Sequence, residues 1–144
     1  MTRLMFICHG NICRSPMAEA VMNHLVAQAG RSAEFEIASA ATSAEEIGHD
    51  VYPPARRVLS RHGIPCPTRR AVRLTPADYA RYDRLLCMEQ YNRRNALALL
   101  GGDPDGKLRL LIPDHDVADP WYSGDFDTAY REIEEGCRQL LLEL

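Results

Sequence analysis

Lysine is almost absent from this sequence of 144 residues, in which Lys107 stands beside 16 arginines. Acidic residues outnumber basic ones by 20 to 17 and leave a formal net charge of −3, so the chain lacks the overall positive charge of a nucleic-acid-binding domain. No segment approaches the roughly 18 apolar residues of a membrane-spanning helix, and the apolar run Leu4 to Ile7 is too short for a signal peptide. We therefore expect a cytoplasmic protein without nucleic-acid or membrane partners.

Cysteine pairs with metal-binding spacing are missing as well. No two of the five cysteines form a Cys-x-x-Cys motif, and the five histidines are scattered. This pattern lacks the ligand spacing of a zinc site, so the sequence predicts reduced thiols, no metal and no other cofactor. A functional cysteine in such a chain is more readily catalytic than structural. The cysteines are Cys8, Cys13, Cys66, Cys87 and Cys137.

Length and composition are those of an ordinary globular protein. Apolar residues make up 46% and charged residues 26% of the chain, which excludes disordered and fibrous classes. A chain of this size buries roughly 68–70% of its unfolded surface. We therefore expect a single domain that spans residues 1–144.

Segments typical of strands and of helices alternate along the chain. Short apolar runs predict strands, and helical spacing bounded by caps, proline or glycine predicts helices. Such alternation is typical of βαβ units and hence of a parallel sheet covered on both faces. The predicted strands are residues 3–7, 35–40, 84–88 and 108–112, and the predicted helices are residues 16–29, 55–62, a short one starting at 75, 89–100 and 127–144.

The loops that follow the strands are where a ligand site is expected, because ligands bind beyond the carboxyl ends of the strands in open α/β sheets. In the first of these loops, Cys8 and Arg14 stand at the two ends of a short turn with a helix behind it. Gly10 and Asn11 tolerate positive φ angles, so that the amides of the loop and of the helix N-terminus can converge on an anion. The loops are residues 8–15, 39–43, 88–91 and 113–126.

The chemistry of this first loop suits the transfer of phosphate. Arg14 can bind two phosphate oxygens through its planar guanidinium group. A helix N-terminus and a nearby arginine favour the thiolate, which is the nucleophilic form of Cys8, and Ser15 can donate a hydrogen bond to it. Spacing alone is weak evidence, since Cys87 and Arg93 share it. That second segment has no glycine, and its Glu89 is expected to repel phosphate.

The run Cys8-His-Gly-Asn-Ile-Cys-Arg-Ser-Pro16 resembles the active-site loop of the low-molecular-weight protein tyrosine phosphatases. The resemblance continues, in the order of the family, through Ser39-Ala-Ala-Thr-Ser43, Arg61-His-Gly-Ile64, Leu86-Cys-Met88 and Asp119-Pro-Trp-Tyr122. It implies a three-layer, Rossmann-like α/β fold whose four-stranded parallel sheet has the order 2-1-3-4, with helices on both faces. It also implies metal-free hydrolysis of phosphotyrosine in proteins and of small aryl phosphates through a phosphocysteine intermediate, by a monomer or weak dimer.

The resemblance assigns three catalytic residues: Cys8 as nucleophile, Arg14 as phosphate ligand and Asp119 as general acid and base. Among the five aspartates after the fourth strand, Asp119 is also favoured by its neighbours, because Pro120 stiffens the loop and the two aromatic residues that follow can line an aryl ring. The implied substrate-binding residues are His9, Gly10, Asn11, Ile12, Cys13, Ser15, Trp121 and Tyr122, and the implied supporting residues, which brace the loop with Asn11, are Ser43 and His62.

Two of these residues have a second interpretation. Cys13 resembles a cysteine that can trap the nucleophile as a reversible disulfide under oxidants, but a small packed side chain explains it as well. His62 also fits as a histidine at a helix end beside Gly63.

The chain departs from the family pattern at the entrance to the expected site. Glu45 stands where the family often has an aromatic residue that flanks the substrate ring. Together with Glu46 it is expected to disfavour acidic phosphopeptides, while Tyr52 supplies some of the lost aromatic surface. Glu89 stands where many relatives have aspartate.

Three rival functions remain as alternatives. Relatives that hydrolyse phosphoarginine carry threonine at the position of Ile12, whose apolar side chain favours an aryl phosphate. Arsenate reductases with this fold have a second cysteine about seven residues after the one in the third strand, where this chain has Arg94. A non-catalytic phosphate-binding domain is expected to lack Cys8 or Asp119, and both are present.

Overall fold

The computed structural model describes all 144 residues and contains one sheet of four strands in the order β2-β1-β3-β4. Each neighbouring pair of strands is parallel. The predicted fold class and strand order are therefore confirmed. The strands are β1 (Thr2–Cys8), β2 (Phe35–Ala41), β3 (Arg84–Cys87) and β4 (Leu108–Leu110).

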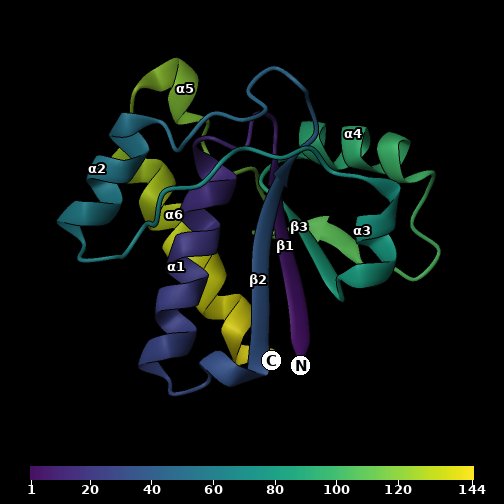
Figure 1. Ribbon diagram of the computed structural model, residues 1–144, viewed down its shortest axis with the longest axis horizontal. Coiled ribbons are helices and arrows are strands. Elements are labelled where there is room, and N and C mark those ends of the chain that lie inside the picture. Colours follow the sequence, from purple (N-terminus) through teal and green to yellow (C-terminus); the bar gives the residue numbers. More distant parts are fainter.

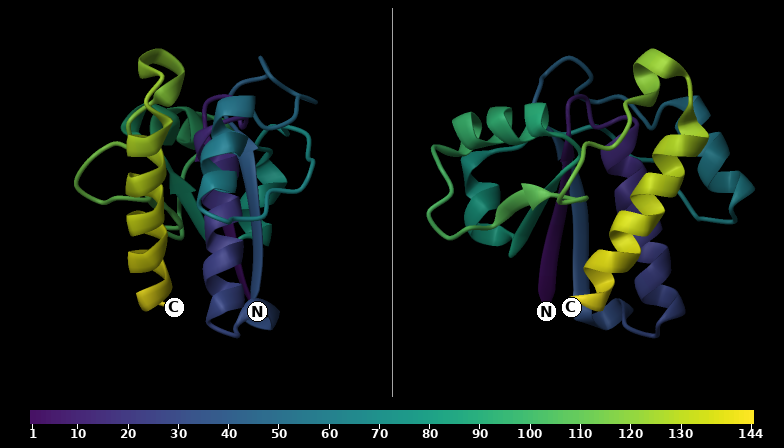
Figure 2. Two further views of the ribbon diagram at one scale, coloured as in Figure 1. Left: turned by 90° about the vertical axis from the view of Figure 1, so that its left-hand side faces the viewer. Right: turned by 180° about the vertical axis from the view of Figure 1, so that it is seen from behind.

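Helices cover both faces of the sheet and make the three layers (Figure 1). Figure 2 shows α1 and α6 side by side against one face, with α2 outside α1, while α3 and α4 cover the other face. The longer helices are α1 (Arg14–Gln28), α2 (Pro53–Arg61), α4 (Gln90–Leu100) and α6 (Phe126–Leu142), and the short ones are a 3₁₀ turn (Ser32–Glu34), α3 (Pro76–Arg81) and α5 (Pro120–Ser123). No helix has both the length and the apolar character needed to cross a membrane.

The central strand β1 is buried on both sides, which explains its uninterrupted apolar sequence. Leu4 and Phe6 belong to the core cluster formed with α1, α2 and α6. Met5 and Ile7, which point the opposite way, belong to the cluster formed with α3 and α4. The strand therefore holds its last residue, Cys8, between two packed layers.

Two element boundaries, the start of α1 and the end of β4, differ from the predicted ones for local reasons. Helix α1 begins at Arg14 rather than Pro16, because the amide of Met17 already bonds to the carbonyl of Cys13 (3.1 Å). Proline is tolerated at the third helical position, where no intrahelical N–H bond is made. Strand β4 ends at Leu110, and Pro113 soon after it has no N–H group with which to continue the ladder.

Helix α6 packs closely against the segment that follows β4. A methyl group placed on Gly136 would lie 2.8 Å from Cγ of the buried Leu111, closer than carbon atoms approach one another. Glycine at this position therefore lets α6 approach the end of the sheet. The adjacent turn of the helix is fixed by Ile133, which is fully buried.

Candidate active site

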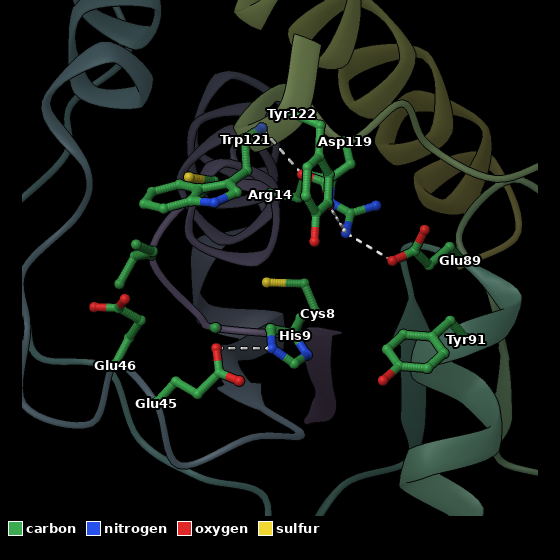
Figure 3. Close-up of a pocket in the computed structure, with 13 residues that line it drawn as sticks. Cys8, His9, Arg14, Glu45, Glu46, Glu89, Tyr91, Asp119, Trp121 and Tyr122 are labelled. Atoms are coloured by element: carbon green, nitrogen blue, oxygen red, sulfur yellow. Dashed lines mark hydrogen bonds and ion pairs between the residues drawn. The ribbon is translucent and has the colours of Figure 1, made fainter. Parts of the chain in front are cut away.

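A cavity of about 630 Å³ opens beyond the carboxyl ends of the strands (Figure 3). Four segments line it: the loop after β1, the segment after β2, the start of α4, and α5 with the residue before it. This is the edge of the sheet at which the sequence placed the site. The predicted site residues that line the cavity are Cys8, His9, Gly10, Ile12, Cys13, Arg14, Asp119, Trp121 and Tyr122.

The sulfur of Cys8 lies where the loop closes on itself. Ser15 Oγ is 2.9 Å from Cys8 Sγ, and the amide of Asn11 donates to the same sulfur over 3.3 Å. The amides of residues 12–15 donate to no acceptor of the protein. The loop and the start of α1 therefore carry free N–H groups, which an anion-binding site requires.

Asn11 has the left-handed conformation that the sequence predicted, with φ = 59°. Its side chain is fully buried and all its polar groups are satisfied. Its Nδ2 donates to the hydroxyls of Ser15 (2.8 Å) and Ser39 (2.9 Å). Its Oδ1 accepts from Arg69 Nη2 (2.9 Å) and from the amide of Val72 (3.1 Å). This network holds the loop in its strained backbone conformation.

Ser43 and His62, which were expected to brace the loop together with Asn11, make no side-chain hydrogen bond to Asn11. The hydroxyl of Ser43 accepts from the amide of Glu45 (3.4 Å), and only its backbone reaches the loop, where its amide donates to the carbonyl of His9 (3.1 Å). His62 lies at the end of α2 and stacks on Tyr130 of α6, with 4.0 Å between the ring centroids.

Ser39 and Arg69 supply the bracing instead. Ser39 lies opposite Phe6 in the β1–β2 register and therefore near the start of the loop. Its hydroxyl also donates to Glu19 (2.6 Å). Arg69 donates a second hydrogen bond, to the carbonyl of Asn11 (3.1 Å). Ser39 lies in residues 39–43, one of the segments where the sequence predicted a ligand site, whereas nothing in the sequence pointed to Arg69.

Arg14 is only 2% exposed and is held from two sides. Its Nη1 donates to the carbonyl of Val117 (2.9 Å), and its Nη2 donates to Glu89 Oε1 (2.9 Å) and lies 3.4 Å from Asp119 Oδ2. Burial alone would lower the pKa of Arg14, but the hydrogen bond that Arg14 donates to Glu89 and the nearby charges of Cys8, Glu89 and Asp119 raise it. The guanidinium group therefore stays charged.

Glu89 is a site residue whose place the sequence analysis missed. The expectation that its carboxylate repels phosphate overlooked the ion pair with Arg14, which offsets its charge. Glu89 is the N-cap residue of α4, and its amide donates to Asn92 Oδ1 (3.1 Å). Its position after a strand end was the signal that could have identified it.

Asp119 stands at the mouth of the cavity as the N-cap of α5. Its Oδ1 accepts from the amide of Trp121 (3.1 Å), and its side chain is 26% exposed. A group that is both fixed and partly open to solvent can exchange a proton with a bound molecule and with water. The helix α5 was missed because a single turn is too short to show helical periodicity, although Asp-Pro is a typical helix start.

Aromatic side chains form the outer wall of the cavity. Trp121 and Tyr122 are 52% and 86% exposed. Tyr52 packs against Trp121 at 5.0 Å between ring centroids, so it supports this wall instead of lining the cavity itself. Tyr91 of α4 faces the wall from the other side (Figure 3) and lies 6.2 Å from the ring of His9.

The second cysteine of the loop is chemically distinct from the first. Cys13 is a free, buried thiol, and its burial, with smaller contributions from the charges of Cys8 and Asp119, raises its pKa to about 12. Cys13 is therefore protonated at neutral pH and does not compete as a nucleophile.

Two carboxylates stand on the remaining side of the cavity. Glu45 is 69% exposed and pairs with His9 (Nε2 to Oε2, 3.1 Å). Glu46 is more covered and pairs with His49 (2.5 Å).

No group of three or more His, Cys, Asp or Glu side chains in the structure is arranged to hold a metal ion.

Comparisons with known proteins point to one family. Residues 3–144 match the family model described as low molecular weight phosphotyrosine protein phosphatase. The human protein of that name is 36% identical over 152 residues, which cover 96% of this chain and 92% of the human one. The crystal structure of YfkJ from Bacillus subtilis matches with a TM-score of 0.95 at 31% identity and covers 99% of this chain and 94% of that one. Wzb from Vibrio vulnificus, solved in complex with benzylphosphonate, matches with a TM-score of 0.88 at 27% identity and covers 99% of both chains.

The bracing of Asn11 by Arg69 leads to a first testable expectation. Arg69→Ala removes two charge-assisted hydrogen bonds to a buried residue, so we expect the free energy of unfolding to fall by about 1.5–3 kcal/mol. Urea denaturation measures this loss. Arg70→Ala is the control, because Arg70 is exposed and makes no hydrogen bond. Equal stabilities of the two variants would contradict the bracing role.

Proposed function

Because the chain belongs to the low molecular weight phosphotyrosine protein phosphatase family and is accordingly a hydrolase, we propose that it removes phosphate from phosphotyrosine in proteins, and from small aryl phosphates, through a phosphocysteine intermediate. The observation that carries this proposal is the juxtaposition of three groups in one cavity. Cys8, whose loop carries free amides, lines the same cavity as Arg14 and Asp119.

The first step transfers phosphate to the protein. The thiolate of Cys8 attacks phosphorus in line with the bond to the phenolic oxygen, so that an S–P bond forms while the P–O bond breaks. Arg14 and the loop amides hold the three other phosphate oxygens throughout. Asp119, protonated at this stage, gives its proton to the departing phenolate oxygen, a contribution typically of about 10²–10⁴-fold in rate.

The second step returns the protein to its starting state. Asp119 is now a carboxylate and takes a proton from a water molecule, whose oxygen attacks phosphorus. The S–P bond breaks, inorganic phosphate is formed, and the sulfur leaves as a thiolate. Ser15 Oγ, at 2.9 Å, stabilises this thiolate by donating a hydrogen bond.

The lining of the cavity supports an aryl substrate. Trp121, Tyr122 and Tyr91 provide flat apolar surfaces for a phenyl ring, and Ile12 adds an apolar side chain in the loop. The complex of Vibrio vulnificus Wzb with benzylphosphonate shows that a relative of this fold binds a phenyl group attached to a phosphonate. An apolar lining also favours phosphotyrosine over phosphoarginine, whose guanidinium group is polar.

The role of Cys8 is tested by trapping the intermediate. We expect hydrolysis of p-nitrophenyl phosphate to continue in the presence of EDTA, to stop with vanadate, and to fall on the order of 10³-fold or more in Cys8→Ser. Mass spectrometry of acid-quenched enzyme and substrate should detect one phosphoryl group on the peptide that contains Cys8. Cys66→Ser, which changes a cysteine outside the cavity, should keep full activity. Turnover that requires a metal, or that survives the loss of Cys8, would refute the mechanism.

The role of Asp119 is tested with leaving groups of different acidity. Asp119→Asn cannot donate the proton, so kcat/KM for phenyl phosphate, whose leaving group needs it, should fall by about 10²-fold or more. A much smaller loss is expected for p-nitrophenyl phosphate, because nitrophenolate leaves without protonation. An equal loss of kcat/KM for both substrates would show that another residue is the general acid.

The carboxylates at the entrance determine which peptides are preferred. Two phosphotyrosine peptides that differ only in Lys or Glu beside the phosphotyrosine should differ in kcat/KM by up to about fivefold in favour of Lys, as expected for an exposed ion pair of roughly 1 kcal/mol. Glu45→Gln should reduce this difference, and so should added salt. Glu135→Gln, which removes an exposed charge from α6, is the matched control. A preference that Glu45→Gln leaves unchanged would show that Glu45 does not contribute.

A further inference from the structure

The loop that carries Asp119 is held to the protein at successive residues. Asp116 accepts a hydrogen bond from the amide of Gln90 (3.0 Å). The amide of Val117 donates to the carbonyl of Met88 (2.8 Å). Both of these contacts come from the β3–α4 side of the cavity and fix the loop up to two residues before Asp119.

The last residue before Asp119 is held from the opposite side by Glu132 of α6. Glu132 Oε1 accepts from the amide of Ala118 (3.0 Å), and its Oε2 pairs with Nε2 of His115 (2.9 Å). The other ring nitrogen of His115 lies 3.1 Å from Asp114 Oδ1. One carboxylate therefore connects the beginning of the loop with its end.

His115 and Ala118 contact the two carboxylate oxygens of Glu132, and these contacts together form a bridge from His115 through Glu132 to Ala118. The hydrogen bond to Glu132 raises the pKa of His115, and that to Asp114 adds to the effect, although burial alone would lower it. Each ring nitrogen faces a carboxylate oxygen, and an imidazolium ring can donate to both of them.

Helix α6 is a rigid support for Glu132. The neighbouring Ile133 is fully buried, and Gly136 lies against Leu111 one turn further along the helix. The carboxylate is itself only 24% exposed. Its position relative to the cavity is therefore set by the packing of α6 and does not depend on the loop.

We propose that Glu132 is a positioning residue for Asp119, because its hydrogen bond to Ala118 holds the Asp119 carboxyl toward the leaving group. The inference rests on the proposed role of Asp119 as general acid. Asp119 Oδ2 already lies 3.4 Å from Arg14 Nη2. A loop released from α6 lets the carboxyl move onto Arg14, away from the phenolic oxygen. Displacements of about 1 Å at a reacting group can cost about 10²-fold in rate.

The test measures kcat/KM for phenyl phosphate and p-nitrophenyl phosphate in Glu132 variants. Glu132→Ala should lower kcat/KM for phenyl phosphate about tenfold and for p-nitrophenyl phosphate less than twofold. Glu132→Gln keeps an oxygen for the Ala118 amide, so it should restore phenyl phosphate hydrolysis to within about threefold of the unmodified protein. Glu135→Ala removes an exposed carboxylate from the same helix and should change neither substrate.

The same substitution made in the Asp119→Asn variant distinguishes a positioning role of Glu132 from a general loss of structure. In Asp119→Asn, adding Glu132→Ala should cause no further loss with phenyl phosphate, because the acid that Glu132 positions is already gone. Equal losses with both substrates, or a full further loss in Asp119→Asn, would refute the positioning role. If Asp119→Asn alone lowers kcat/KM equally for both substrates, the proposed role of Asp119 as general acid fails as well. A failure of the positioning role can therefore be told apart from a failure of the proposed function.

His115→Ala provides an independent variant if Glu132→Ala unfolds. It removes one half of the bridge without changing α6, and the Glu132 bond to Ala118 remains. We expect a loss of about twofold to threefold with phenyl phosphate and none with p-nitrophenyl phosphate. A loss that is the same for both substrates would again overturn the inference.

Discussion

Asn11 turns the loop after β1 through a left-handed backbone conformation, and the other contacts of the site depend on that turn. A residue with a Cβ atom adopts such a φ angle, here 59°, only at a cost in free energy. Four hydrogen bonds to its buried side chain offset this cost. The turn directs its own amide to Cys8 Sγ and leaves the next amides free at the start of α1. The site is thus a backbone structure that side chains from three other segments hold in place.

The charges around the cavity explain why the amides matter. Arg14 is the one arginine or lysine that lines the cavity, and Glu45, Glu46, Glu89 and Asp119 line it too. A phosphate dianion that enters this space meets more carboxylates than cations. Its binding must therefore draw on the N–H groups of the loop and the helix N-terminus, which carry partial positive charge. The pairing of Glu89 with Arg14 also fixes the guanidinium before any ligand arrives.

Much of the fold and part of the site could be predicted from the sequence. The alternating segments and the resemblance to the family predicted the sheet and its order. The positive φ angle expected in the loop after β1 is found at Asn11, whereas Gly10 does not adopt one. The partners of Asn11 could not be predicted from local sequence. Arg69 reaches Asn11 because the segment after α2 returns beside the loop, where Arg73 forms a bridge with Ala41. Such a return depends on tertiary packing, which short-range patterns do not encode.

The network around Asn11 also has a consequence for biosynthesis. Cys8 leaves the ribosome before Ser39, Arg69 and Val72, which fix the loop around it. A nascent chain that ends before residue 69 carries the thiol without the ordered amides that make a phosphate site. Newly made protein therefore gains its anion-binding loop only after residue 72 has emerged, and translation products that end earlier carry the cysteine without that loop.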